Sequence, residues 1–143
     1  MWREAWQEVC ASHADKPAQL AEGIDEHPHR CLVDRFRLIQ VFRNLFDNSF
    51  AACENEVKVR INVAEVDDGR SIRVFLRDDG SGMSEEARER LFEPFFSTRT
   101  RGTGLGMTIA RRIVDAHGGE IALVSTSPTG TEFSITLPRS QPH

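Results

Sequence analysis

Residues 36–53 carry the clearest helical pattern in this chain. At 100° per residue, one side of a helix over this segment collects apolar and small residues, namely Leu38, Phe42, Leu45, Phe46, Ser49 and Cys53. The opposite side collects polar residues, namely Arg37, Gln40, Asn44 and Asn48. The segment is therefore predicted to form a helix with a core face and a polar face on which two amides, Asn44 and Asn48, lie one turn apart.

Two stretches of alternating apolar and polar residues follow this helix. Apolar residues occupy every second position in residues 57–63 and again in residues 72–76. The Asp-Asp-Gly-Arg sequence at residues 67–70 has the composition of a tight turn between strands. We predict a β-hairpin whose second strand leads directly into Asp78.

Two further helices are predicted from apolar residues at helical spacing. One covers residues 1–14 and is ended by Pro17. The other covers residues 103–117, and Gly118 supplies the position after its last turn. Both are expected to pack one apolar face against the rest of the chain.

The remaining elements are short. Ser84 is a suitable N-cap for a helix that reaches about Phe92, and Pro94 stops that helix. Residues 95–101 have no regular apolar spacing, so we expect a mobile lid there. Strands are predicted over residues 19–24, 30–33, 121–125 and 132–137, with a turn at residues 127–130 between the last two.

Composition and charge limit the classes of protein to which this chain can belong. A chain of 143 residues with 39% hydrophobic and 28% charged residues suits one globular domain, with a core over about residues 18–138 and a disordered tail at 139–143. A net charge of −4 gives no general attraction to nucleic acid or an anionic membrane, so any phosphate site must be local. No apolar run has the length of a membrane span, and we expect no direct membrane contact. Three cysteines without zinc-site spacing indicate reduced thiols and a cytoplasmic location.

Two glycine-rich runs contain five of the ten glycines. The first, residues 78–82, follows the hairpin, and the second, residues 102–106, opens a predicted helix. Backbone N–H groups in a glycine-rich turn at a helix start can bind a phosphate. The second run lacks a dinucleotide fingerprint, since its third glycine comes one residue early, and it has no Walker lysine. Our hypothesis is a phosphate at residues 102–106 and a base at Asp78.

Asp78 suits recognition of adenine. A buried carboxylate accepts a hydrogen bond from the exocyclic amine of adenine, and guanine has no donor at the equivalent place. Gly80 and Gly82 would let the ring approach. The same residues would also suit a plain tight turn at the end of a strand.

Several side chains could serve a triphosphate, each with an ordinary alternative. Asn48 could give Mg²⁺ one oxygen ligand, the others coming from phosphate and water, or it could be a solvated amide like Asn44. Asp47 is turned about 100° away from these amides and suits a structural contact. Arg99 and Arg101 could neutralise a transferred phosphoryl group or form a solvated pair. Aromatic residues near them most often belong to a core, namely Phe92, Phe95 and Phe96.

Taken together, these motifs resemble the ATP-binding catalytic domain of two-component sensor histidine kinases, in the group that includes gyrase and heat-shock chaperone ATPases. Five parts occur in the expected order: residues 44–48 resemble the N box, 78–82 the first glycine box, 92–96 the F box, 102–106 the second glycine box and 130–131 the closing Gly-Thr. The resemblance implies an α/β fold, a two-layer sandwich with a mixed, mostly antiparallel sheet covered by helices on one face. It also implies ATP and Mg²⁺ as ligands.

The resemblance assigns roles to individual residues. Asn48 would bind the metal, and Asn44, Asn48 and Arg99 would take part in catalysis. Thr131 would lie near the adenine with Asp78, directly or through water. The complete implied binding set is Asn44, Asn48, Asp78, Gly80, Gly82, Met83, Phe92, Arg99, Gly102, Thr103, Gly104, Leu105, Gly106 and Thr131.

Asn44 helps to distinguish the histidine kinases from the ATPases within this group. The ATPases have at this place a Glu that can activate water, and an amide has no such basicity. The sequence therefore favours transfer of the γ-phosphoryl group to a histidine of a separate dimerisation domain, which then serves a response regulator. An ATPase clamp and a non-catalytic nucleotide-sensing module remain alternatives.

The chain also departs from the kinase pattern. Ala51 and Ala52 occupy places where some sensor kinases have a Lys and a Tyr near the phosphates. No phospho-acceptor hairpin is present, and His13 has the wrong neighbours for an acceptor. We therefore expect this fragment alone not to phosphorylate itself.

Overall fold

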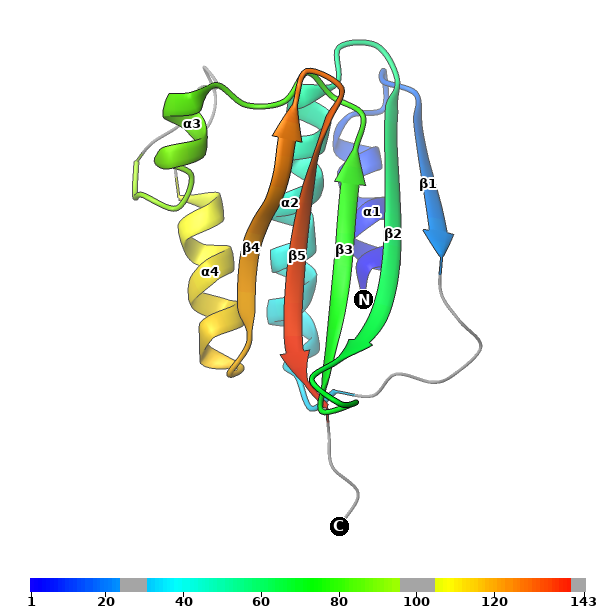
Figure 1. Ribbon diagram of the computed structural model, residues 1–143. Helices are drawn as coiled ribbons and strands as arrows, with labels where there is room; N and C mark the ends of the chain where they lie inside the picture. The colour runs from blue at the N-terminus through cyan, green and yellow to red at the C-terminus, as the bar shows by residue number, and fades with distance from the viewer. Residues whose placement is uncertain (24–30, 96–104, 140–143) are drawn as a thin grey trace.

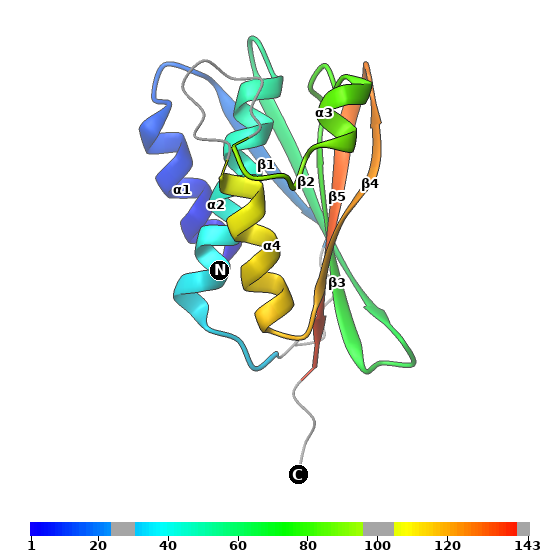
Figure 2. The same cartoon turned by 90° about the vertical axis from the view of Figure 1, so that its left-hand side faces the viewer.

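The computed structural model describes residues 1–23, 31–95 and 105–139. Within these ranges the chain forms two layers, with a sheet on one side and helices α1, α2 and α4 on the other (Figures 1 and 2). The elements in chain order are α1 (Trp2–Ser12), β1 (Ala18–Gly23), α2 (Arg35–Ala52), β2 (Val57–Val66), β3 (Ser71–Asp78), α3 (Glu85–Glu89), α4 (Gly106–Ala116), β4 (Glu120–Ser127) and β5 (Gly130–Pro138). The predicted two-layer α/β sandwich is confirmed.

The sheet has five strands in the order β1-β2-β3-β5-β4. β1 is parallel to β2, and the other three pairs are antiparallel, so the sheet is mixed and mostly antiparallel as predicted. The β2–β3 hairpin turns through Asp67, Asp68 and Gly69, all three with positive φ. This turn places the end of β3 in the middle of the sheet, beside β2 and β5 (Figure 1).

The core lies between α2 and the sheet. The predicted core face of α2 is buried, and Leu38, Leu45 and Phe46 have no exposed surface. α1 packs on the same helix through edge contacts between Trp2 and Phe42 and between Trp6 and Phe46, whose ring centroids are 5.9 and 5.1 Å apart. Such aromatic contacts add to the burial of apolar surface that holds α1 in place.

Three local predictions were wrong. Residues 31–33 form no strand, because this segment leads into the N-cap of α2, where the backbone N–H of Asp34 donates to Nε2 of His117 at 2.9 Å. α3 ends at Glu89, before the expected Phe92, because Arg90 already leaves the helical conformation as the C-cap. Arg139, expected to begin a disordered tail, donates its backbone N–H to the carbonyl of Arg70 at 2.8 Å.

The cysteines are free thiols in the described part of the chain. Burial, together with the nearby Asp78 and Asp79 carboxylates, raises the pKa of Cys53 to about 11. This thiol therefore stays protonated near neutral pH and is a poor nucleophile. As for membranes, no helix in the described ranges combines the length and the apolar character that a span requires.

Candidate functional site

The site is built around Asp78, the last residue of β3. Alternation along the strand points its side chain toward the helices, and the residue is only 3% exposed. Its Oδ1 accepts the backbone N–H of Gly80 at 2.9 Å. On β5, Thr131 lies directly opposite and is 2% exposed. Two predicted site residues from distant parts of the sequence are thus neighbours.

Burial sets the electrostatics of this carboxyl group. Desolvation raises the pKa of Asp78 above its ordinary value of 3.8. Hydrogen bonds from the Gly80 N–H, the Ser49 hydroxyl and the Thr131 backbone pull the pKa down but do not cancel the effect of burial. A carboxylate held in this way can still accept a further N–H donor, because each oxygen has two lone pairs.

Two residues of this network were missed by the sequence analysis. Ser49 is 1% exposed on the core face of α2, and its hydroxyl hydrogen can go to Asp78 or to the Leu45 carbonyl, which is 3.3 Å away. Thr126 accepts the Met83 N–H at 3.0 Å, and its hydroxyl lies 2.9 Å from that of Thr131. A lone hydroxyl on an otherwise apolar helix face was the available signal for Ser49.

The structure explains the first glycine run by contacts inside the protein. A Cβ on Gly80 would lie 2.7 Å from the Cβ of Ala52, and a Cβ on Gly82 would lie 2.1 Å from the carbonyl oxygen of Ser127. Gly82 also has a φ of +80°, a conformation that favours glycine. Both glycines are therefore required by the packing of this turn, before any ligand is considered.

The polar face of α2 meets the start of α4. The Asn44 amide donates to the backbone carbonyl of Gly106 at 2.9 Å. Asn48 lies one turn further along the same face and is half-buried. Leu105 precedes the first turn of α4 and is half-buried as well. Asn44 of the N box and Gly106 of the second glycine run are thus in contact.

Phe92 links the segment after α3 to α4. Its carbonyl accepts the Thr108 hydroxyl at 3.0 Å, and the Arg111 guanidinium lies over its ring, 5.2 Å from the centroid. Phe95, by contrast, is 80% exposed and has a φ of +65°. Four predicted site residues and most of the expected lid lie outside the described residues, namely Arg99, Gly102, Thr103 and Gly104.

Comparison with known proteins decides the family. A model of the "Histidine kinase-, DNA gyrase B-, and HSP90-like ATPase" family matches residues 33–141, about three quarters of the chain. This protein belongs to that ATPase family. The match covers every element from α2 to β5.

Individual relatives of this ATPase domain are sensor kinases. The sensor protein TdiS of Thauera aromatica is 38% identical over 108 residues, which are 73% of this chain and 20% of TdiS. The nucleotide-free catalytic domain of histidine kinase ThkA has a TM-score of 0.80 at 30% identity, over 98% of this chain and 92% of that domain. Full-length ShkA in complex with AMPPNP has a TM-score of 0.81 at 27% identity, over 99% of this chain and 30% of ShkA.

The ATPase domain spans only a fraction of its curated relatives. It covers about a fifth of TdiS and 14% of sporulation kinase E of Bacillus subtilis. The resemblance to sensor-kinase catalytic domains is nevertheless confirmed by both the relatives and the solved catalytic domain.

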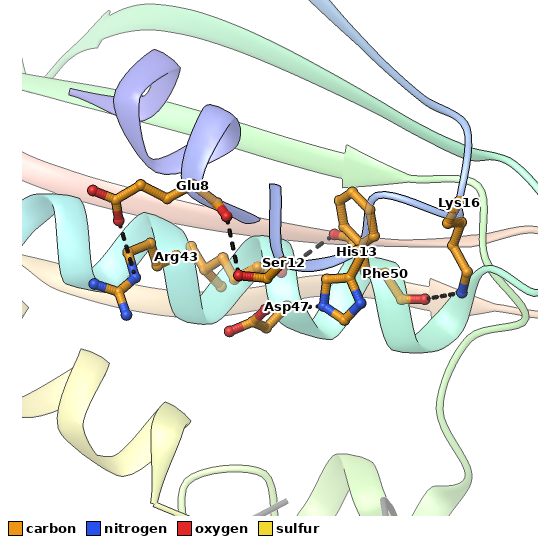
Figure 3. Close-up of polar contacts among 9 residues, drawn as sticks. Glu8, Ser12, His13, Lys16, Arg43, Asp47 and Phe50 are labelled. Atoms are coloured by element: carbon orange, nitrogen blue, oxygen red, sulfur yellow. Dashed lines mark hydrogen bonds and ion pairs between the residues drawn. The ribbon is translucent and has the colours of Figure 1, made fainter. Parts of the chain in front are cut away.

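The last turn of α2 is held by the segment that follows α1 (Figure 3). Lys16 Nζ donates to the carbonyls of Phe50 and Cys53 at 2.9 and 2.7 Å and so caps the helix C-terminus. His13 stacks on the Phe50 ring at 5.0 Å, and its Nε2 lies 3.6 Å from Oδ1 of Asp47. Asp47 therefore makes a contact with the α1 segment and points away from the amides of Asn44 and Asn48, as predicted.

The described residues contain no group of three or more His, Cys, Asp or Glu side chains able to hold a metal ion. A cation at Asn48 would therefore need most of its ligands from elsewhere. Phosphate and water oxygens supply such ligands for Mg²⁺, which often takes only one or two from the protein. The donor set around Asn48 fits a metal that arrives with a nucleotide.

Proposed function

We propose that this domain binds Mg-ATP and transfers the γ-phosphoryl group to a histidine on a separate dimerisation domain, in the cytoplasmic part of a two-component signalling protein. Asp78 would accept a hydrogen bond from the adenine amine. The desolvated position of its carboxylate supports this role, since a charge-assisted hydrogen bond in a buried place is strong and selective. The AMPPNP complex of ShkA adds support from a related fold.

The triphosphate would extend from Asp78 toward Asn48 and the start of α4. Mg²⁺, when bound with ATP, would neutralise charge on the phosphates. Asn48 would give it one oxygen. Asn44 would keep α4 in place through its bond to Gly106, so that Leu105 and Gly106 meet the phosphates at a helix N-terminus. We also assign Arg99 to the transferred phosphoryl group, and Gly80, Gly82, Met83, Phe92 and residues 102–104 to the nucleotide.

The hydrogen bond from Asn44 to Gly106 is the observation that favours phosphoryl transfer to a histidine over hydrolysis of ATP. An amide has no usable basicity, and this one already donates to a backbone carbonyl. A site without a base at this position suits an acceptor that needs no activation. A neutral imidazole nitrogen is such an acceptor.

The described histidines of this chain serve its own structure. His13 stacks on Phe50, and His117 contacts the carbonyl of Ile113 through Nδ1 at 2.7 Å while Nε2 accepts the Asp34 N–H. This supports an acceptor on another domain. A response regulator would then receive the phosphoryl group from that domain.

The test uses radiolabelled ATP with label in the γ position. With Mg²⁺ and the dimerisation domain of the same parent protein, we expect label on that domain and none on this chain. Asn48→Ala should abolish transfer, whereas Asp47→Asn, a change on the neighbouring residue that faces α1, should preserve it.

Two results would contradict the proposal. Steady release of phosphate by the isolated chain, lost in Asn48→Ala, would instead indicate an ATPase clamp. ATP binding without transfer to any cognate domain would indicate a nucleotide-sensing module.

A further inference from the structure

The face of the sheet that carries no helices has a shallow hollow of about 360 Å³ over β1, β2 and β3. In Figure 1 this face is turned toward the viewer, and α1 and α2 lie behind the strands. Five residues whose side chains point to this face line the hollow, namely Gln19, Ala21, Lys58, Arg60 and Arg77. Asp79 also belongs to the lining, although its Oδ1 lies 3.6 Å from the sulfur of Cys53. Asp78, at the end of β3, points its side chain toward the helix-covered face. The hollow and the proposed adenine site therefore lie on opposite faces of the sheet.

The charge in this hollow is positive although the whole chain carries −4. Three cations face one exposed acid, Asp79, within the lining. Arg60 and Arg77 are direct cross-strand partners in the β2–β3 register. Like charges placed opposite one another on a sheet destabilise it, so the fold gains nothing from this pair.

Neither Arg60 nor Arg77 makes a hydrogen bond or ion pair that involves the described residues. Another arginine on the same face of β3 shows the alternative, since Arg73 donates from Nε to the Thr136 hydroxyl at 2.9 Å. Glu132 lies opposite Arg77 on β5 but forms no ion pair with it among the described side chains. Lys58 makes only a distant contact with Glu56, at 4.0 Å.

Exposed arginines are ordinary, and one of them alone would carry no argument. Here the guanidinium groups of Arg60 and Arg77, which have no partners among the described residues, lie next to each other and beside Lys58. The small side chain of Ala21 leaves the hollow open next to them. Guanidinium groups bind carboxylates with two parallel hydrogen bonds. We propose that this hollow is a docking site for an acidic segment of a partner polypeptide, whose carboxylates bind Arg60 and Arg77.

The shape and charge favour a polypeptide over other anions. Small-molecule sites are mostly enclosed, whereas this hollow is open on the flat face of a sheet. Nucleic acid and anionic membranes need a broad positive surface, and Asp79, Glu132 and the net charge of −4 oppose that. A segment with a few carboxylates matches a patch of this size.

The experiment measures binding of a short fluorescein-labelled peptide of alternating Glu and Ser by fluorescence anisotropy. We expect saturable binding that weakens with added salt, and no binding of the matching Lys and Ser peptide. Arg60→Glu/Arg77→Glu should weaken binding about tenfold or more. The control Arg70→Glu/Arg112→Glu makes the same change in charge at exposed positions outside the hollow and should keep wild-type affinity.

Chemical-shift mapping on the wild-type chain tests the place directly and does not depend on a variant that folds. Added peptide should shift the amides of residues 19–21, 58–60 and 77–79. Absence of saturable binding, equal loss in the two double variants, or shifts elsewhere would overturn the proposal. Tighter binding of single-stranded DNA or phosphatidylserine vesicles than of the acidic peptide would also overturn it. ATP affinity should be the same in both double variants, which separates this site from the nucleotide site.

Discussion

On the helix-covered face of the sheet, the carboxylate of Asp78 is 3% exposed and has hydrogen-bond donors from three segments of the chain. On the open face, its sequence neighbour Arg77 points the other way and has no partner among the described residues. One step along β3 therefore separates a charge that the fold surrounds from a charge that the fold leaves to solvent. The difference shows which polar groups the protein needs for its own structure and which remain available to other molecules.

The cations also divide into those with hydrogen-bond partners and those without. Lys16, near the end of α2, donates to two carbonyls, whereas Arg60 on the open face donates to none in the described part of the protein. Removing a partnered cation should therefore lower stability more than removing an unpartnered one. Five predictions test how the two faces differ.

The largest effect is expected from Gly130→Ala, at the start of β5 and next to the end of β3. A Cβ there would lie 2.2 Å from the Asp78 carbonyl oxygen, and φ is +152°. Strain and overpacking together should lower the free energy of unfolding by about 3 kcal/mol. Gly69→Ala is the control, because Gly69 has a positive φ but open space around it. Equal losses in urea denaturation would contradict the importance of this contact.

Asp78→Asn should weaken ATP binding by about 2 kcal/mol, roughly thirtyfold, because a charge-assisted hydrogen bond to adenine is lost. Preference for ATP over GTP should shrink as well. Asp79→Asn makes the same change at the next residue, which is exposed, and should leave ATP affinity unchanged. Titration calorimetry of both variants measures the difference. Similar affinities for the two would remove Asp78 from the adenine site.

The buried carboxyl group of Asp78 should contribute to the pH dependence of stability. Burial raises the pKa of Asp78 in the folded state above 3.8, so the folded protein binds this proton more tightly than the unfolded chain does. The resulting stabilisation is complete at low pH and is lost as pH rises through the folded-state pKa. Asp78→Asn should therefore gain stability relative to wild type as pH rises from 3.8. Urea titrations of wild type and Asp78→Asn across this range measure the difference.

Lys16→Met and Arg60→Met compare a partnered cation with an unpartnered one. Lys16→Met removes the bonds to Phe50 and Cys53 and should lower the free energy of unfolding by about 1 kcal/mol. Arg60→Met should change it little. If Arg60→Met costs as much as Lys16→Met, the open face contributes to stability and the contrast between the faces fails.

The smallest effect is a gain from Arg60→Glu. An opposite charge across from Arg77 should raise the free energy of unfolding by about 0.5 kcal/mol. The second change, Arg77→Glu, should cancel that gain by restoring like charges. Thermal unfolding of the two single variants and the double variant forms the cycle that isolates this pair. A loss of stability in Arg60→Glu would show that the arginine pair is not repulsive.

Local sequence patterns were enough for much of the fold. The periodicity of α2 and the alternation of β2 and β3 are confirmed because burial on one face imposes those periods directly. The end of α3 was mispredicted because Arg90 already leaves the helical conformation. The strand at residues 31–33 was mispredicted because this segment leads into the N-cap of α2. Ser49 was assigned only to the core, because its contact with Asp78 joins segments far apart in the sequence.

The amino-acid sequence by itself determined the family, the order of the motifs and the residue types at the candidate site, because these depend on local spacing and on the chemistry of single side chains. Only the tertiary structure decided that the Asn44 amide holds the start of α4 and that Gly80 and Gly82 are required by Ala52 and Ser127. It also placed Arg60 beside Arg77 on an open face. These contacts depend on strand register and helix packing, which join residues that the sequence keeps apart.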